Sequence, residues 1–222
     1  MSLHPCERDA LWLYAAFSVA ALVALFLPLG SMGLRICLLV IAFNVALPWV
    51  GHWRGHRLWI SAWLFLLPLS LLQVFPDWFL SAQLGVLVFP DIGAPMIGTV
   101  SAFMGLMWVI PLFMVVLAAE AARTRANLTL GVVTAGLTAL LIFAGSEMFS
   151  WRIPLWYARD VSAWQHMALY VLPAEFLLGI YTYAGYRLTL NSGRALKLAA
   201  AGSIMLLYLG ALAFFYLLIE TI

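Results

Sequence analysis

The chain alternates long apolar runs with short polar connections, and seven of the runs are long enough to cross a membrane as helices. A helix that spans the hydrocarbon core needs about 20 mostly apolar residues. We predict seven spans, at residues 10–29, 34–51, 58–75, 99–120, 128–149, 164–186 and 196–219. The pattern therefore predicts an all-α polytopic membrane protein, in which residues 1–222 form a single seven-helix transmembrane domain.

Composition and charge support a membrane location, because 66% of the residues are hydrophobic and only 9% are charged. The connections after the second, fourth and sixth predicted spans carry Arg54, Arg57, Arg123, Arg125, Arg187, Arg194 and Lys197, whereas the other side has Arg35, Arg152 and Arg159. Since cytoplasmic loops are enriched in Lys and Arg, we predict a cytoplasmic amino terminus, in a bacterial inner membrane. Membrane lipids are expected partners, a homo-oligomer is compatible with the sequence, and no basic stripe indicates nucleic-acid binding.

Two connections on the predicted outer side are long and apolar, and both contain acids. Residues 75–95 include Asp77 and Asp91 around an apolar core that is too short to cross a bilayer, so we expect a re-entrant or interfacial segment. Residues 147–160 begin with Glu147 and mix aromatic residues with arginines and a second acid. The two connections are expected to be parts of one site. The alternative is an interfacial cap whose arginines pair with lipid phosphates or with the acids.

A short internal similarity links these connections. Residues 108–111 (Trp-Val-Ile-Pro) in the fourth predicted span match residues 170–173 (Tyr-Val-Leu-Pro) in the sixth. Each follows an acid at the outer end of the preceding span, Asp77 in one case and Glu147 in the other. Spans 3 and 4 would then correspond to spans 5 and 6 in the same orientation, which is a weak parallel internal repeat.

Glu175 is the candidate for the centre of a site, because it lies inside the apolar run of residues 167–179. An acid in the middle of a bilayer costs about 2.5 to 3.5 kcal/mol on insertion scales, so such residues usually face a bundle interior and mark function. Pro173 breaks backbone hydrogen bonding locally and would open space beside the acid. The structural alternative is that Glu175 joins helices through a hydrogen bond with Tyr181, with Tyr183 or with a neighbouring backbone carbonyl oxygen.

These residues carry a resemblance to the small membrane-embedded lycopene cyclases of the heterodimeric bacterial and archaeal type, whose signature is a proline followed by a glutamate pair. Residues 172–176 (Leu-Pro-Ala-Glu-Phe) keep the first glutamate and have phenylalanine at the second position. The stretch from Asp77 through Gly85 to Pro111 is similar in layout. In size and span count, the chain also resembles the fungal seven-span meroterpenoid cyclases, which use membrane-embedded acids.

The resemblance implies redox-neutral, acid-catalysed cyclisation of a linear isoprenoid (terpenoid, meroterpenoid or carotenoid) through carbocations, with no cofactor and no metal. Glu175 would donate the proton, because an acid kept away from water can remain protonated near neutrality. Glu147, Asp77 or Asp91 would polarise the donor or take the final proton. Aromatic rings would line the cavity and stabilise cations; the candidates are Trp108, Tyr170, Trp156, Tyr157 and Trp164. The lipophilic substrate would enter from the bilayer.

Other functions use the same residues. A small proton- or cation-coupled transporter or channel could conduct along Glu175, Glu147 and Asp77, and a parallel repeat with proline-broken helices suits it equally well. An isoprenoid hydratase would use the same acids with water, and a non-catalytic assembly subunit is a further alternative.

Several of the candidates also have structural interpretations. Asp77 could cap a helix, and Asp91 lies in a Pro-Asp-Ile-Gly sequence that is typical of a turn. The tryptophans could be interfacial or packing residues. His52 and His56 have the spacing of a helical metal pair, but no acid lies near them in the sequence, so we predict no metal site.

Overall fold

The computed structural model describes residues 3–28, 30–150 and 152–221, which are mostly helical. The helices are α1 (Pro5–Phe26), α2 (Met32–Trp53), α3 (Arg57–Leu72), α4 (Val74–Trp78), the π-helix η1 (Phe79–Gln83), α5 (Met104–Met107), α6 (Val109–Arg125), α7 (Leu128–Ser150), α8 (Val171–Leu188) and α9 (Arg194–Glu220). The strands are β1 (Leu87–Val88), β2 (Met96–Ile97), β3 (Val100–Ser101), β4 (Tyr157–Ala158), β5 (Ala163–Trp164) and β6 (Met167–Ala168).

The structure confirms the prediction of a mostly helical protein with helices that are long and apolar enough to span a membrane. Six helical stretches within the described residues are long and apolar enough to cross a membrane: Pro5–Phe26, Met32–Trp53, Arg57–Gln83, Met104–Arg125, Leu128–Phe149 and Arg194–Glu220. The seventh long helix, α8, has 18 residues and is about 27 Å long at 1.5 Å per residue. By these properties the chain is an integral membrane protein.

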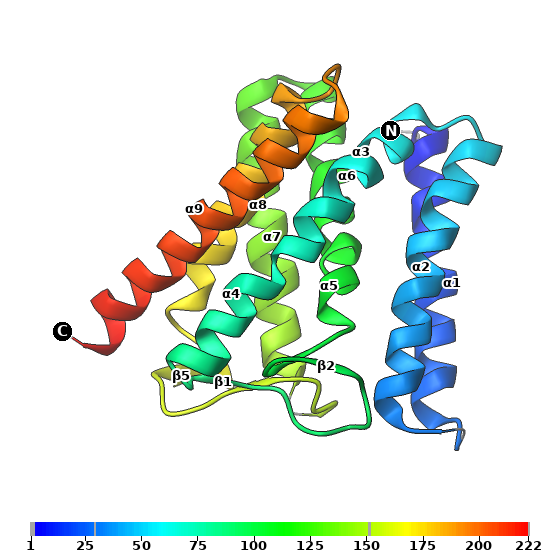
Figure 1. The fold of residues 1–222 in the computed structure, drawn as a ribbon. Helices are drawn as coiled ribbons and strands as arrows, with labels where there is room; N and C mark the ends of the chain where they lie inside the picture. The colour runs from blue at the N-terminus through cyan, green and yellow to red at the C-terminus, as the bar shows by residue number, and fades with distance from the viewer. Residues whose placement is uncertain (1–2, 29, 151, 222) are drawn as a thin grey trace.

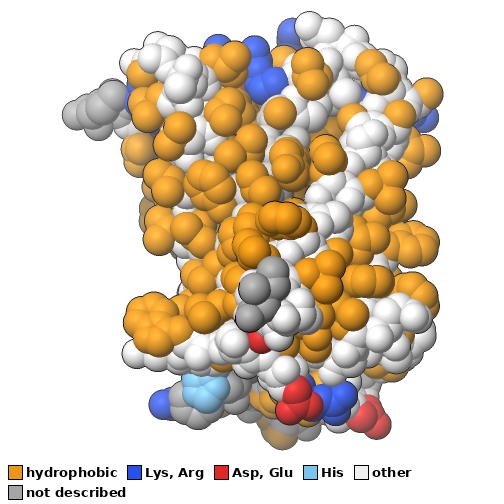
Figure 2. All heavy atoms as spheres, turned by 90° about the vertical axis from the view of Figure 1, so that its left-hand side faces the viewer, with side chains coloured by type: hydrophobic (Ala, Val, Ile, Leu, Met, Phe, Trp, Pro, Cys, Tyr) orange, Lys and Arg blue, Asp and Glu red, His pale blue; other side chains and the backbone are white. Residues whose placement is uncertain are grey.

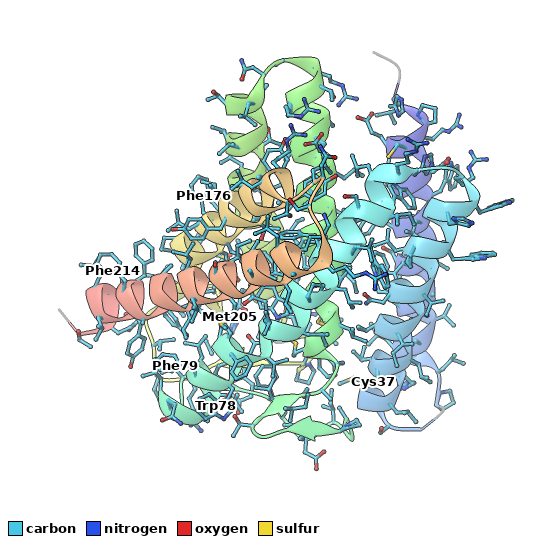
Figure 3. The ribbon with its side chains drawn as sticks, turned by 45° about the horizontal axis from the view of Figure 1, so that its top comes forward. Cys37, Trp78, Phe79, Phe176, Met205 and Phe214 are labelled. Carbon is cyan, nitrogen blue, oxygen red and sulfur yellow. The ribbon has the colours of Figure 1, made fainter. Side chains whose placement is uncertain are left out.

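The two ends of the bundle differ in character (Figure 1). The amino terminus and the arginine-bearing connections α2–α3, α6–α7 and α8–α9 lie at one end, which we call the amino-terminal side. The α1–α2 connection and the short strands lie at the other end, which we call the loop side. Figure 2 shows one face with an apolar middle and charged side chains near both ends, as a membrane-embedded bundle requires. Large side chains such as Phe214 and Trp78 are exposed and point outward from the helical bundle (Figure 3).

Five helices form a closed ring, because α6 packs on α7, α7 on α8, α8 on α9, α9 on α3, and α3 on α6. The α1–α2 pair lies beside this ring, with α2 against α3. Small residues allow close packing between α7 and α8. A Cβ atom added to Gly179 would lie 2.5 Å from the Ala135 carbonyl oxygen and 2.6 Å from the Ala139 Cβ atom. The backbone of α8 is therefore held tightly against α7.

At three of the boundaries that differ from the sequence prediction, the kind of structure differs as well. The third span was expected to end at residue 75, but the helix continues to Gln83, so Asp77 lies in a helix and not in a re-entrant loop. The fourth and sixth spans were expected to begin at residues 99 and 164, where the structure has the hairpins β2–β3 and β5–β6. The strands of both hairpins are mostly apolar, and short apolar strands cannot be told from helix by hydrophobicity alone.

The two unusual connections meet each other on the loop side. Strand β1 follows η1, strand β4 follows α7, and they pair antiparallel, with Leu87 opposite Ala158 and Val88 opposite Tyr157. The Arg159 side chain and backbone N–H donate to the carbonyl oxygens of Gly85 (3.0 Å) and Val86 (2.8 Å), which fixes this pairing. The paired strands lie at the loop-side end of the bundle, and Leu87 and Ala158 line the cavity described below.

Candidate functional site

A cavity of about 380 Å³ lies in the bundle near the loop side and is lined mainly by apolar side chains. Three carboxyl groups line it: Asp77 from α4, Glu147 from the last turns of α7, and Glu175 from the second turn of α8. They are far apart in the sequence, and the fold brings them together because α4 and α7 end, and α8 begins, on the same side. All three are buried, with exposures of 5%, 8% and 3% respectively.

The three acids differ in their hydrogen-bond partners. The Trp108 indole Nε1–H donates to Asp77 Oδ2 at 3.2 Å, and the Trp156 Nε1–H donates to Glu147 Oε1 at 2.6 Å. Glu175 Oε2 is buried and has no hydrogen-bond partner within the described residues. Burying a carboxylate without a partner is costly, whereas an indole donor offsets part of that cost. Glu175 is therefore the acid whose ionisation the site supports least.

Aromatic rings surround the acids. Trp108, Trp156 and Tyr170, which were predicted from the sequence, line the cavity together with Tyr208 of α9. The Trp108 ring centroid lies 5.9 Å from that of Tyr208, with the two rings edge to face. Sequence reasoning missed Tyr208, and the signal that could have identified it was a tyrosine in the middle of the last apolar run.

The remaining predicted site residues do not line the cavity. Asp91 is exposed, and its Oδ1 accepts a hydrogen bond from the Gly93 N–H at 2.9 Å, which is turn geometry. Tyr157 in β4 and Trp164 in β5 are 42% and 59% exposed. In β4 the alternation of side chains turns the Tyr157 ring away from the cavity, while Ala158 lines it. Both residues of β5 are exposed, and it is Ala168 of the paired strand β6 that lines the cavity.

The other wall of the cavity comes from α1 and α2. Tyr14 and Phe17 of α1 and Leu39 of α2 line this side, and the Tyr14 hydroxyl donates to the Ile110 carbonyl oxygen at 2.6 Å. Ile110 immediately precedes Pro111, which also lines the cavity. The α1–α2 pair thus contributes apolar surface and no acid.

A second polar cluster lies on the amino-terminal side, centred on Glu120. The Tyr183 hydroxyl donates to Glu120 Oε1 at 2.8 Å, and Arg123 and Arg187 donate to the same carboxylate at 2.9 and 3.4 Å. Tyr183, which the sequence offered as a partner of Glu175, is therefore bonded to Glu120. Glu120 is buried in a network that joins α6 to α8.

The histidine pair has an acid beside it that the sequence spacing did not indicate. Asp9 of α1 lies 2.8 Å from the His56 Nε2 atom and 2.7 Å from the Arg54 Nε atom. The hydrogen bond that the Arg54 guanidinium donates to Asp9 raises the pKa of Arg54 above its ordinary value. No group of three or more His, Cys, Asp or Glu side chains within the described residues is placed to hold a metal ion. These contacts therefore anchor α1 to the start of α3.

Comparison with known proteins adds one result. No curated protein and no solved structure matches the chain. A family model matches residues 74–219, which contain all three cavity acids, whereas α1 and α2 lie outside the match. Because the match covers more than half of the chain, the protein belongs to the family described as a domain of unknown function (DUF6989).

Proposed function

We propose that the protein is an integral membrane cyclase that converts a linear isoprenoid into a ring-containing isomer by acid catalysis. The observation that carries the proposal is the unpartnered oxygen of Glu175 in an apolar cavity that also holds Asp77 and Glu147. Such a cavity suits a lipophilic substrate, and its volume falls within the usual range for small-molecule sites, about 300 to 1,000 Å³. The resemblance to membrane-embedded terpene cyclases supports the same chemistry.

The three acids have different roles in this mechanism. Glu175, in its neutral form, donates its proton to an alkene or epoxide of the substrate, and a carbocation forms. A second double bond attacks the cation and closes the ring. Asp77 or Glu147, each held by an indole N–H, then removes a proton from carbon, so the product is an isomer of the substrate. No oxidant or reductant is consumed.

The aromatic rings stabilise the intermediates. Trp108, Tyr170, Trp156 and Tyr208 line the cavity, and a cation over an aromatic face gains about 0.5 to 2 kcal/mol. The apolar lining also keeps water away from the carbocation, which would otherwise be quenched to an alcohol. The substrate reaches the cavity from the bilayer.

We propose further that α8 crosses the membrane as a seventh span, with a cytoplasmic amino terminus, and that the chain contains a parallel repeat. Supporting the repeat, a helix, an apolar hairpin and a second helix follow one another twice, with β2–β3 and β5–β6 as the hairpins. Strands β1 and β4 come from corresponding connections and pair with each other. Each unit also contributes an acid held by a tryptophan, Asp77 or Glu147.

The test is mass spectrometry of products formed by the purified protein in lipid vesicles supplied with linear isoprenoids of different chain length. A product of unchanged mass and shorter retention time is expected, and Glu175→Gln should abolish it. Asp160→Asn is the matched control, because Asp160 is exposed and Asn tolerates its positive φ angle. A gain of the mass of water would indicate a hydratase instead, and full turnover by Glu175→Gln would exclude Glu175 as the donor.

A proton-coupled transporter is the second candidate. Gln73 and Thr182 are buried polar side chains with no partner among the described residues, and they lie on the same helical stretches as Asp77 and Glu175, as a conduction path would require. Sealed vesicles would then show a pH-gradient-dependent flux that Glu175→Gln removes. Vesicles that remain tight to protons and to cations would argue against this function.

A further inference from the structure

The residues that line the cavity are not equally buried around it. Those contributed by α4, α8 and α9, which include Asp77, Glu175 and Tyr208, are all buried. Those contributed by α1 and α6, which include Ser18 and Ile110, are all partly or fully exposed. The cavity is therefore closed at the end that holds Glu175 and reaches the surface of the molecule on the side of α1 and α6.

On this open side, the two walls of the cavity come from parts of the molecule that do not pack closely on each other. One wall belongs to α1 and α2, and the other to the helix ring. α1 packs along α2, and α2 packs on α3, but no extensive packing of α1 on α6 or α7 is found among the described residues. The α1–α2 pair accordingly stands to one side of the ring (Figure 1).

α1 touches α6 at Tyr14 and borders the cavity one turn later. The Tyr14 hydroxyl donates to the Ile110 carbonyl oxygen at 2.6 Å, and the Tyr14 ring centroid lies 6.4 Å from that of Phe113. Ser18 lies one turn after Tyr14 on the same face of α1. It lines the cavity and is exposed. A side chain that does both lies at the rim of the cavity, so Ser18 marks the rim on α1.

α7 provides the opposite rim. Ile142 and Ser146 lie one turn apart on the same face of α7, and both line the cavity and are partly exposed. Leu141 is 73% exposed, and a Cβ atom added to Gly145 would meet no atom within 4 Å. No helix among the described residues therefore covers the outer side of α7 at this level, and the cavity opens between this part of α7 and Ser18.

Both rims lie at the depth of the hydrocarbon core. The sequence has no Asp, Glu, Lys or Arg between Asp9 and Arg35, or between Arg125 and Glu147. Ser18 lies about 20 Å from the start of α1, and the hydrocarbon core of a bilayer is about 30 Å thick. The opening is therefore surrounded by lipid chains and by lipophilic compounds dissolved among them.

We infer that the opening between α1 and α7 is a lateral portal through which an isoprenoid chain passes from the bilayer into the cavity. The portal consists of Phe17 and Ser18 on α1 and of Ile142 and Ser146 on α7. The reactive end of the chain enters first and reaches Glu175 at the closed end of the cavity. The rest of the chain lies between the two helices.

The chemical class of the occupant rests on the proposed function, whereas the position of the portal rests on the exposure of the lining alone. The other hydrocarbon chain at this depth is that of a membrane phospholipid. A groove that held only such a chain would need no acid at its inner end, where burying Glu175 is costly. The acids at the closed end therefore favour a substrate over a resident lipid.

Occupation of the portal can be measured by photo-cross-linking. The amino acid p-benzoylphenylalanine replaces Ser18 in one variant and Ala20 in the matched control. Ala20 is exposed and lies two residues further on, on the opposite side of α1. Each purified protein is reconstituted in phosphatidylcholine vesicles with increasing amounts of geranylgeraniol, a linear isoprenoid. The adducts that form under ultraviolet light are identified by mass spectrometry.

At position 18, the geranylgeraniol adduct should rise to a plateau and displace the phospholipid adduct. At position 20, both adducts should follow the composition of the bilayer without a plateau. The same dependence at both positions would overturn the portal. Phospholipid adducts at position 18 that geranylgeraniol does not displace would also overturn it, because the opening would then hold a membrane lipid.

This labelling needs no turnover, so it should persist in Glu175→Gln. Failure of the cyclase proposal would therefore look different from failure of the portal. In the first case, labelling at position 18 would reach a plateau but no cyclised product would form. In the second case, a cyclised product would form without such labelling.

A blocking substitution gives a second measurement, on the substrate that is converted. Ser18→Trp places a bulky ring at the rim and should lower kcat/KM by about tenfold or more, because fewer encounters lead into the cavity. Ala20→Trp places the same ring on the lipid-facing side of α1 and should change kcat/KM by less than about twofold. Equal kcat/KM values in the two variants would overturn the portal.

Discussion

Substituting Gly179 by alanine should loosen the contact between α7 and α8 and displace Glu175. The added Cβ atom would lie 2.5 Å from the Ala135 carbonyl oxygen and 2.6 Å from the Ala139 Cβ atom. Favourable contacts between heavy atoms lie at about 3.5 to 4.0 Å, so α8 must move by about 1 Å. Overpacking of this kind typically costs about 1 to 3 kcal/mol.

The effect should reach the cavity because Gly179 lies one helical turn from Glu175 on α8. A misplacement of about 1 Å at a reacting group can lower a rate by about a hundredfold. We therefore expect Gly179→Ala to lower both the free energy of unfolding and the turnover of any substrate. Unfolding is measured by steric trapping in bicelles, and turnover by product mass spectrometry.

Gly202→Ala is the matched control, because a Cβ atom at Gly202 in α9 meets no atom within 4 Å. Alanine has a higher helix propensity than glycine by about 0.8 to 1 kcal/mol, so this variant should be as stable as the unmodified protein or slightly more stable. Equal stability of the two variants, to within about 0.5 kcal/mol, would refute the packing argument.

Three further substitutions test separate contacts. Tyr183→Phe removes the 2.8 Å hydrogen bond to Glu120 and should lower the free energy of unfolding by about 0.6 to 1.7 kcal/mol; no change would mean that the arginines alone hold the carboxylate. Trp156→Phe removes one hydrogen-bond donor to Glu147 and should lower kcat roughly tenfold to a hundredfold, since such bonds are worth about 1.5 to 3 kcal/mol; an unchanged kcat would argue against a role for this hydrogen bond in the mechanism. Asp91→Asn should change kcat by less than about twofold, because it affects only an exposed turn; a large decrease in kcat would show that Asp91 does contribute to the site.

The sequence predicted the convergence of the cavity acids well, for a physical reason. Exposing an acid to the hydrocarbon core of a membrane costs so much free energy that Asp77, Glu147 and Glu175 are expected to face the interior of the bundle. Their tryptophan partners were not predicted: the sequence offered Trp108 and Trp156 as cavity rings, whereas in the structure their indole N–H groups also donate to Asp77 and Glu147.

Two of the predicted site residues that do not line the cavity, Trp164 and Asp91, lie in segments whose structure is determined by local backbone geometry. Trp164 lies in an apolar run that resembles a helix, but positive φ angles at Gln165 and His166 make a hairpin there. Asp91 accepts a local hydrogen bond from its own turn. Tyr208 was missed because it has no acid or motif near it in the sequence, and only the packing of α9 into the ring brings it to the cavity.

The source of the added proton tests the central claim most directly. The purified protein in vesicles is incubated in D₂O with the linear isoprenoid that gives product, and the product is analysed by mass spectrometry. If Glu175 donates a solvent-exchangeable proton to start cyclisation, each new ring carries one deuterium at carbon, and Glu175→Gln forms no labelled product. A cyclised product without deuterium, or labelling that persists in Glu175→Gln, would contradict the assignment of Glu175 as the acid.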